Sequence, residues 1–73
     1  MTMLQKTLQI INRALKDKLA TDPIELQGFL GAHLQYARKV GMPAQYELEI
    51  EAALEKVING ATYQELMRPS SSA

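Results

Sequence analysis

The apolar residues of this 73-residue chain recur every three or four positions, and a few prolines and glycines interrupt the pattern. This spacing is typical of amphipathic helices, and no stretch alternates with the period of two that half-buried strands show. Proline and glycine begin or end helices, and here they stand at Pro23, Gly41, Pro43, Gly60 and Pro69. The short linkers force successive helices to fold back on each other. The sequence therefore predicts an all-α fold, a small antiparallel helical hairpin or three-helix arrangement with a short fourth helical turn.

The length allows a single helical domain over residues 1–69, followed by a disordered tail at 70–73. A chain of this size buries only about 60% of its unfolded surface, so a partner that adds to the core would stabilise it. Eight basic and eight acidic residues cancel, which argues against non-specific binding to nucleic acid and to anionic membranes. Cysteine is absent, so disulfides and thiolate metal sites are excluded, and a reducing cytoplasm is compatible. Neither a signal peptide nor a membrane-spanning stretch is predicted.

The first predicted helix covers residues 3–20. Its apolar face consists of Leu4, Leu8, Ile11, Leu15 and Leu19, with Met3, Ile10 and Ala14 beside it. Lys6, Arg13 and Lys16 fall on the opposite side, which indicates a solvated basic face. The apolar surface is wide enough to contact two neighbouring helices.

The second predicted helix covers residues 23–40. Asp22 is a suitable N-cap, Pro23 suits the first helical position, Glu25 occupies the capping-box position and Gly41 ends the helix. The apolar face comprises Leu26, Phe29, Leu30, His33, Tyr36, Ala37 and Val40, with Leu34 at its margin. Gly28 and Gly31 lie on the other side with Ala32 and Gln35, although glycine in a helix interior costs up to about 1 kcal/mol relative to alanine. We therefore interpret this small-residue patch as a contact for a partner, or else as a pair of tolerated exposed glycines.

The third predicted helix covers residues 43–59, and Gly60 ends it. Its buried face is predicted to be Tyr46, Ile50, Ala53, Leu54, Val57 and Ile58. Glu47, Glu51 and Glu55 form a like-charge ridge, which favours a basic neighbour such as Lys6, Arg13 or a partner's cation, or else simple solvation. Thr62 and Glu65 have the spacing of a capping box and predict a last short turn that ends at Pro69.

Residues for catalysis are few. All serines lie in the tail, and the single histidine, His33, has no acidic residue three or four positions away to orient it. A metal site would need several converging ligands, whereas the helical neighbours of His33 are apolar or aromatic. The sequence thus predicts no enzyme, no cofactor and no metal, with His33 in the core or in an interface.

One segment is compatible with DNA binding. "INGATYQELM" resembles the turn and first residues of a helix-turn-helix, but a recognition helix with basic and amide side chains would have to follow. Only Arg68 is basic there, and Pro69 comes next. A small DNA-binding or phage or plasmid regulatory protein, acting as a homodimer, remains the alternative.

The stretch 26–58 has a helix that ends in "ARKVG", a tight "MPAQY" turn and an acidic return helix, "ELEIEAALEKVI". It resembles the small co-chaperones of type III secretion needle subunits, the YscE-like proteins, several of which carry a Gln-Tyr pair at the place of Gln45 and Tyr46. The resemblance implies a cytoplasmic helical hairpin without catalytic activity. It also implies two partners, a larger tetratricopeptide-like chaperone and the needle subunit that the pair keeps monomeric before export. The first segment departs from that pattern, because Pro23 separates it from the hairpin.

The predicted apolar faces are larger than a 73-residue hairpin can bury by itself, so we expect a partner to share them. The predicted partner-binding residues are Leu26, Gly28, Phe29, Leu30, Gly31, His33, Tyr36, Ile50, Leu54 and Ile58. Without its partner, the chain is expected to be poorly stable or to self-associate.

Overall fold

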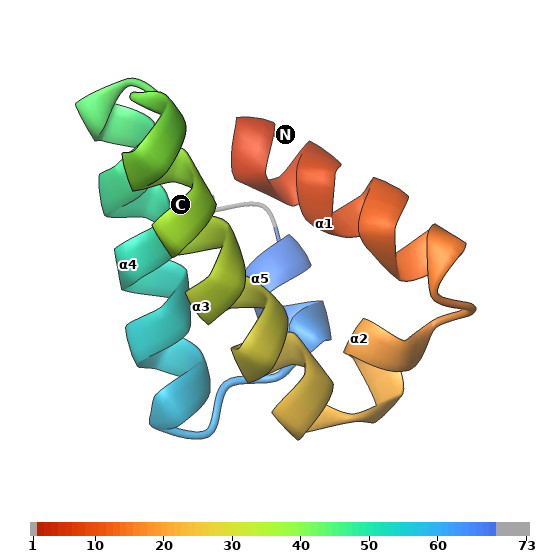
Figure 1. Cartoon of the computed structure of the whole chain (residues 1–73). Helices are drawn as coiled ribbons and strands as arrows, with labels where there is room; N and C mark the ends of the chain where they lie inside the picture. Colours follow the sequence, from red (N-terminus) through yellow and green to blue (C-terminus); the bar gives the residue numbers. More distant parts are fainter. Residues whose placement is uncertain (1, 69–73) are drawn as a thin grey trace.

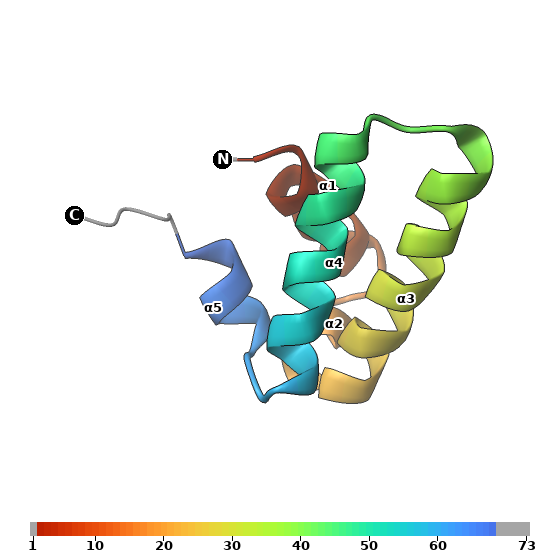
Figure 2. The ribbon, with the colours of Figure 1, turned by 90° about the vertical axis from the view of Figure 1, so that its left-hand side faces the viewer.

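A computed structural model describes residues 2–68 of the protein. The helices in this range are α1 (Met3–Ala14), α2 (Lys18–Thr21), α3 (Pro23–Val40), α4 (Ala44–Ile58) and α5 (Tyr63–Met67). Figures 1 and 2 show α3 and α4 as an antiparallel hairpin, with α1 and α2 packed against it and α5 in contact with α2. The described residues contain no strand, so the predicted all-α fold is confirmed. The predicted end at Pro69 and tail at 70–73 lie outside the described residues.

The start of α3 follows from three consecutive signals. Asp22 Oδ1 accepts hydrogen bonds from the amides of Ile24 (3.0 Å) and Glu25 (3.4 Å), which would otherwise lack a partner at the helix start. Pro23 is the first helical residue, where its missing N–H costs nothing. The predicted span 23–40 is confirmed, and α4 is one residue shorter at each end than predicted.

Glycine ends both helices of the hairpin. Gly41 after α3 and Gly60 after α4 adopt left-handed conformations, with φ of 76° and 103°. In each case the next amide bonds back five residues: Met42 to the carbonyl of Ala37, and Ala61 to that of Lys56. This closing bond is characteristic of the Schellman motif, which requires a left-handed residue that glycine adopts without steric cost.

The prediction of one continuous helix over residues 3–20 is wrong, because the chain breaks between α1 and α2. Lys16 and Asp17 both adopt left-handed conformations, with φ of 54° and 68°. The amide of Asp17 bonds back to the carbonyl of Asn12, the same closing bond as in α3 and α4 but without a glycine. For a residue with a Cβ atom, this conformation costs about 1–2 kcal/mol. Other contacts must therefore hold the break in place.

Asn12, the one buried polar residue among those described, supplies these contacts. Its Oδ1 accepts hydrogen bonds from the amides of Leu19 (3.0 Å) and Ala20 (3.2 Å). Its Nδ2 donates to Oδ1 of Asp17 at 3.1 Å. The two amides lie in the first turn of α2, where helical amides lack their usual partners and Asp17 gives no side-chain cap. The amide of Ala20 also bonds to the carbonyl of Asp17, whereas that of Leu19 bonds to Asn12. Asn12 thus caps α2 from the preceding helix.

The short α5 begins with the predicted capping box between Thr62 and Glu65, which is confirmed. Gln5 of α1 holds this helix from the other end of the chain. Its Nε2 donates to the carbonyl oxygens of Leu66 at 2.9 Å and Arg68 at 3.4 Å. The first and last helices are therefore joined directly.

The core lies between the hairpin and the first two helices. Its buried residues are Leu4, Leu8, Leu19, Leu26, Leu30, Leu34, Ala37, Tyr46, Ile50, Ala53 and Val57. Leu15, predicted to face the core, is exposed because the break turns it outward. Leu34, placed at the margin of the predicted face, is buried.

Candidate protein-binding surface

A chain of hydrogen bonds links three helices at one side of the core. Nε2 of His33 in α3 lies 2.6 Å from the phenolic oxygen of Tyr46 in α4. That hydroxyl donates to Oγ1 of Thr7 in α1 at 3.3 Å, and Thr7 donates to the carbonyl of Met3 at 3.1 Å. These bonds fasten α1 to the hairpin. No pattern in the sequence indicates this role of Thr7.

The 2.6 Å contact between His33 and Tyr46 is a hydrogen bond in either neutral tautomer of His33. The imidazole Nε2 and the phenolic oxygen can each donate or accept, so the tautomer decides which of them donates.

Three aromatic rings follow one flank of α3. The rings of Phe29 and His33 stack with centroids 5.2 Å apart, and those of His33 and Tyr36 stack at 6.1 Å. The ring of Tyr46 meets His33 edge-on at 5.5 Å. Burial lowers the pKa of His33 below its ordinary value of 6.5, because the imidazolium is poorly solvated there. The histidine is a neutral member of an aromatic cluster at pH 7.

Further apolar side chains of α1 and α3 are exposed to solvent on the helices that carry this cluster and its hydrogen bonds. Tyr36 (56% exposed) and Val40, which lie on the predicted apolar face, are both exposed to solvent. On α1, Met3 and Ile10 (68% exposed) lie at helical spacing beside Thr7, which contacts the same tyrosine as His33. We call the following residues the α1–α3 surface: the exposed Met3, Ile10, Tyr36 and Val40, with the partly buried rings of Phe29 and His33. A surface of this kind is typical of a protein-binding site.

The structure divides the predicted partner-binding residues into three groups. Leu26, Leu30 and Ile50 are fully enclosed in the core, so they offer no area to a partner in this conformation. Phe29, His33 and Tyr36 lie on the α1–α3 surface. The remaining four, Gly28, Gly31, Leu54 and Ile58, belong to the rest of the hairpin.

Among these four, Ile58 was predicted to be buried but is 61% exposed. Leu54 is partly buried. No atom lies within 4 Å of where a Cβ would stand on Gly28 or Gly31, so packing inside the chain does not require glycine at either position.

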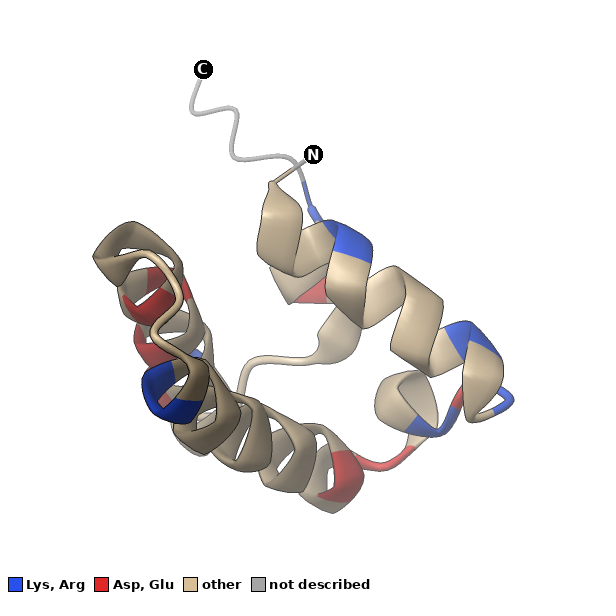
Figure 3. Cartoon of the chain, turned by 45° about the horizontal axis from the view of Figure 1, so that its top comes forward, with Lys and Arg blue, Asp and Glu red and all other residues tan. Residues whose placement is uncertain are grey.

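Charge is unevenly distributed over the molecule although it cancels in sum. Figure 3 shows basic residues along α1 and α2, and acidic residues along α4. Arg38 of α3 pairs with Glu51 of the acidic ridge at 2.8 Å, and both side chains are about half exposed. In the described part of the chain this is the only salt bridge, and neither Lys6 nor Arg13 reaches the ridge.

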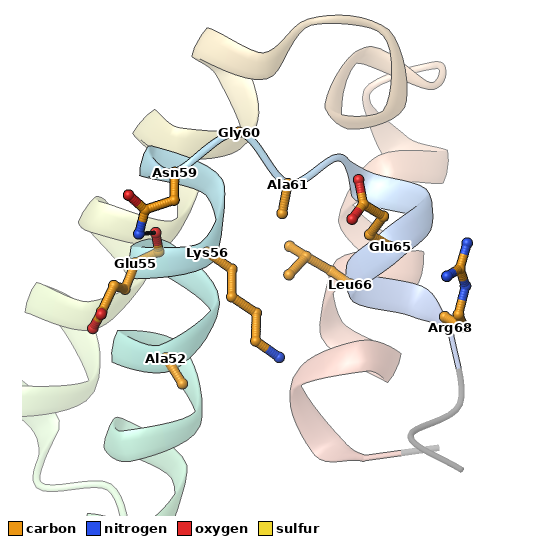
Figure 4. Close-up of a pocket in the computed structure, with 9 residues that line it drawn as sticks. All are labelled: Ala52, Glu55, Lys56, Asn59, Gly60, Ala61, Glu65, Leu66 and Arg68. Atoms are coloured by element: carbon orange, nitrogen blue, oxygen red, sulfur yellow. Dashed lines mark hydrogen bonds between the residues drawn. The ribbon is translucent and has the colours of Figure 1, made fainter. Parts of the chain in front are cut away.

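Two adjoining cavities lie beside α4, one between α4 and α5 and the other between α1, α4 and α5. In the one drawn in Figure 4, about 640 Å³, Lys56 extends from α4 and Leu66 from α5 into the space between the helices. The second, about 840 Å³, adds an apolar floor with Leu4 and Leu8. Their linings combine apolar side chains with charges of both signs, and the single histidine lies elsewhere.

Within residues 2–68, no three His, Cys, Asp or Glu side chains come together as a metal site. None of the helices described combines the length and apolar character needed to span a bilayer. In comparisons with known protein families, curated proteins and solved structures, none matched the chain.

Proposed function

We propose that the chain is a non-catalytic protein-binding module, a cytoplasmic co-chaperone of type III secretion. In this role it pairs with a larger tetratricopeptide-like chaperone and helps to keep the needle subunit monomeric before export. The observation that carries the proposal is the α1–α3 surface, where exposed apolar side chains lie on two helices that part-buried hydrogen bonds join.

The shape of the molecule is consistent with such a role. An apolar helical surface suits the groove of a larger helical partner, because binding removes its side chains from water. The hairpin α3–α4 spans most of the stretch that resembles the YscE-like proteins. Rigid aromatic anchors such as Tyr36 contribute large contact areas at low entropic cost.

The proposal is tested by co-expressing the chain with a tetratricopeptide-like chaperone encoded nearby and with the needle subunit, followed by light scattering of the purified material. We expect a soluble ternary complex. Tyr36→Asp and Ile10→Asp should each abolish it, because a carboxylate would be buried in the interface. Leu48→Asp, at an exposed apolar position on α4, is the matched control and should leave the complex intact.

Two results would count against the proposal. One is a chain that stays separate from both proteins during purification. The other is salt-sensitive binding to DNA of its own promoter region, which would favour the regulatory alternative.

A further inference from the structure

We propose that two copies of this chain exchange α1. In the exchanged dimer the break at residues 15–17 straightens, α1 and α2 form one continuous helix, and each α1 docks on the α4 of the other copy. This inference does not depend on the chaperone partner proposed above, because the partner here is a second copy.

The first observation is the strained break itself. The ends of α3 and α4 place glycine in the left-handed position, whereas the end of α1 places Lys16 and Asp17 there. Straightening releases both residues into the right-handed helical region. Short strained hinges of this kind favour the exchange of the segment that they connect.

The second observation is that the sequence across the break suits a continuous helix. Leu15 and Leu19 continue the apolar face of Leu4 and Leu8 at helical spacing. In a straight helix the amides of Leu19 and Ala20 would bond to the carbonyls of Leu15 and Lys16, so they would no longer need Asn12. Leu15, now exposed, would join the apolar face.

The third observation identifies what replaces α1 after opening. Docked α1 buries Leu4 and Leu8, and it bonds to Tyr46 through Thr7 and to Leu66 through Gln5. A monomer that merely opened would lose all of these contacts. The α1 of a second copy is the one segment certain to restore each of them, because it carries the same residues.

One contact holds the closed form against exchange. The side chain of Asn12 keeps its three hydrogen bonds only while the break exists. Because these bonds favour the closed monomer, the dimer forms only at high protein concentration and dissociates on dilution.

The test follows the wild-type chain by analytical ultracentrifugation up to about 1 mM, the range in which weak association is visible. The dimer is then examined by NMR in an equal mixture of isotope-labelled and unlabelled chains. Exchange predicts intermolecular nuclear Overhauser effects between Thr7 and the ring of Tyr46, whose hydroxyl oxygens lie 3.3 Å apart. A chain that stays monomeric over this range, or a dimer that shows this contact only within one chain, would overturn the proposal.

Three variants separate exchange from simple side-by-side association. Lys16→Gly removes strain from the closed monomer. It also weakens the straight helix of each chain in the dimer, so self-association should weaken roughly a hundredfold. Lys16→Ala is the control and should change it little, because alanine and lysine have similar preferences for both states. Asp17→Ala removes a bond to Asn12 and favours the helix, so association should strengthen roughly fivefold. Equal association of the glycine and alanine variants would contradict exchange.

Discussion

The end of α3 and the end of α1 close with the same backbone hydrogen bond, from an amide to the carbonyl five residues earlier. At the end of α3 the left-handed residue is Gly41, which adopts that conformation freely. At the end of α1 two residues with side chains adopt it, and a buried asparagine compensates. The hairpin is thus encoded by local signals, whereas the α1–α2 segment depends on a tertiary contact. Two pairs of substitutions test this difference directly.

The largest expected effect concerns the two asparagines at helix ends. Asn12→Ala should lower the free energy of unfolding by about 1–3 kcal/mol, because the buried amide of Leu19 loses its acceptor and that of Ala20 keeps only the carbonyl of Asp17. Asn59→Ala is the matched control, since the side chain of Asn59 makes one exposed hydrogen bond, to the carbonyl of Glu55, and it should change stability by less than about 0.5 kcal/mol. Urea unfolding followed by circular dichroism measures both. Equal losses in the two variants would show that Asn12 has no special role.

The second prediction exchanges the residue types of the two helix ends. Gly41→Ala should cost about 1–2 kcal/mol, because alanine is strained at φ of 76°. Lys16→Gly should instead stabilise the monomer, by about 1 kcal/mol, because it relieves the same strain at φ of 54°. Thermal unfolding at low protein concentration measures whether each variant is less or more stable than the wild type. A loss of stability in Lys16→Gly would remove the contrast between the two ends.

The third prediction concerns the glycines inside α3. Gly28→Ala and Gly31→Ala should each stabilise the chain by about 0.5–1 kcal/mol, because the new methyl groups meet no atom and alanine favours the helix. Differential scanning calorimetry of the single variants measures this gain. Partner binding then distinguishes the two interpretations of the patch. Lost association indicates a contact surface, whereas intact association indicates two tolerated glycines.

The smallest expected effect is a dependence of stability on pH. Burial lowers the pKa of His33 in the folded chain, so the unfolded chain binds the proton more readily. The contribution of His33 is therefore complete above its unfolded pKa and is lost as the pH falls through its lower folded pKa. Urea midpoints at about pH 7.5 and about pH 5 should differ less in His33→Gln than in the wild type. An unchanged difference would assign the dependence to other groups.

Residues with strong local preferences allowed most of the fold to be predicted. Asp22, Pro23, Gly41 and Gly60 set the limits of the hairpin, and the pair Thr62 and Glu65 set the start of α5. The break after α1 has no such signal, because Lys16 favours a helix and one aspartate, Asp17, does not by itself end one. The position of Asn12 on the apolar face was the available indication, since a buried amide needs partners that a continuous helix does not provide.

The candidate surface was predicted only in part, for a different reason. Helical spacing identified the flank with Phe29, His33 and Tyr36, but it does not say which part of a wide apolar face a small core covers. The buried face of α3 is turned toward Leu34, which leaves Tyr36 and Val40 in solvent. The part of the apolar face of α3 that is covered depends on the direction of α1, and that direction follows from the break between α1 and α2.

The hydrogen bonds of Gln5 to the carbonyls of Leu66 and Arg68 join residues 61 and 63 positions apart. Closing so long a loop is entropically costly, whereas the hairpin forms from neighbouring segments. We infer that α3 and α4 associate early in folding and that α1 docks late. Leu8→Ala in α1 should therefore speed unfolding and leave the folding rate nearly unchanged in stopped-flow measurements, whereas a slower folding rate would place α1 in the nucleus.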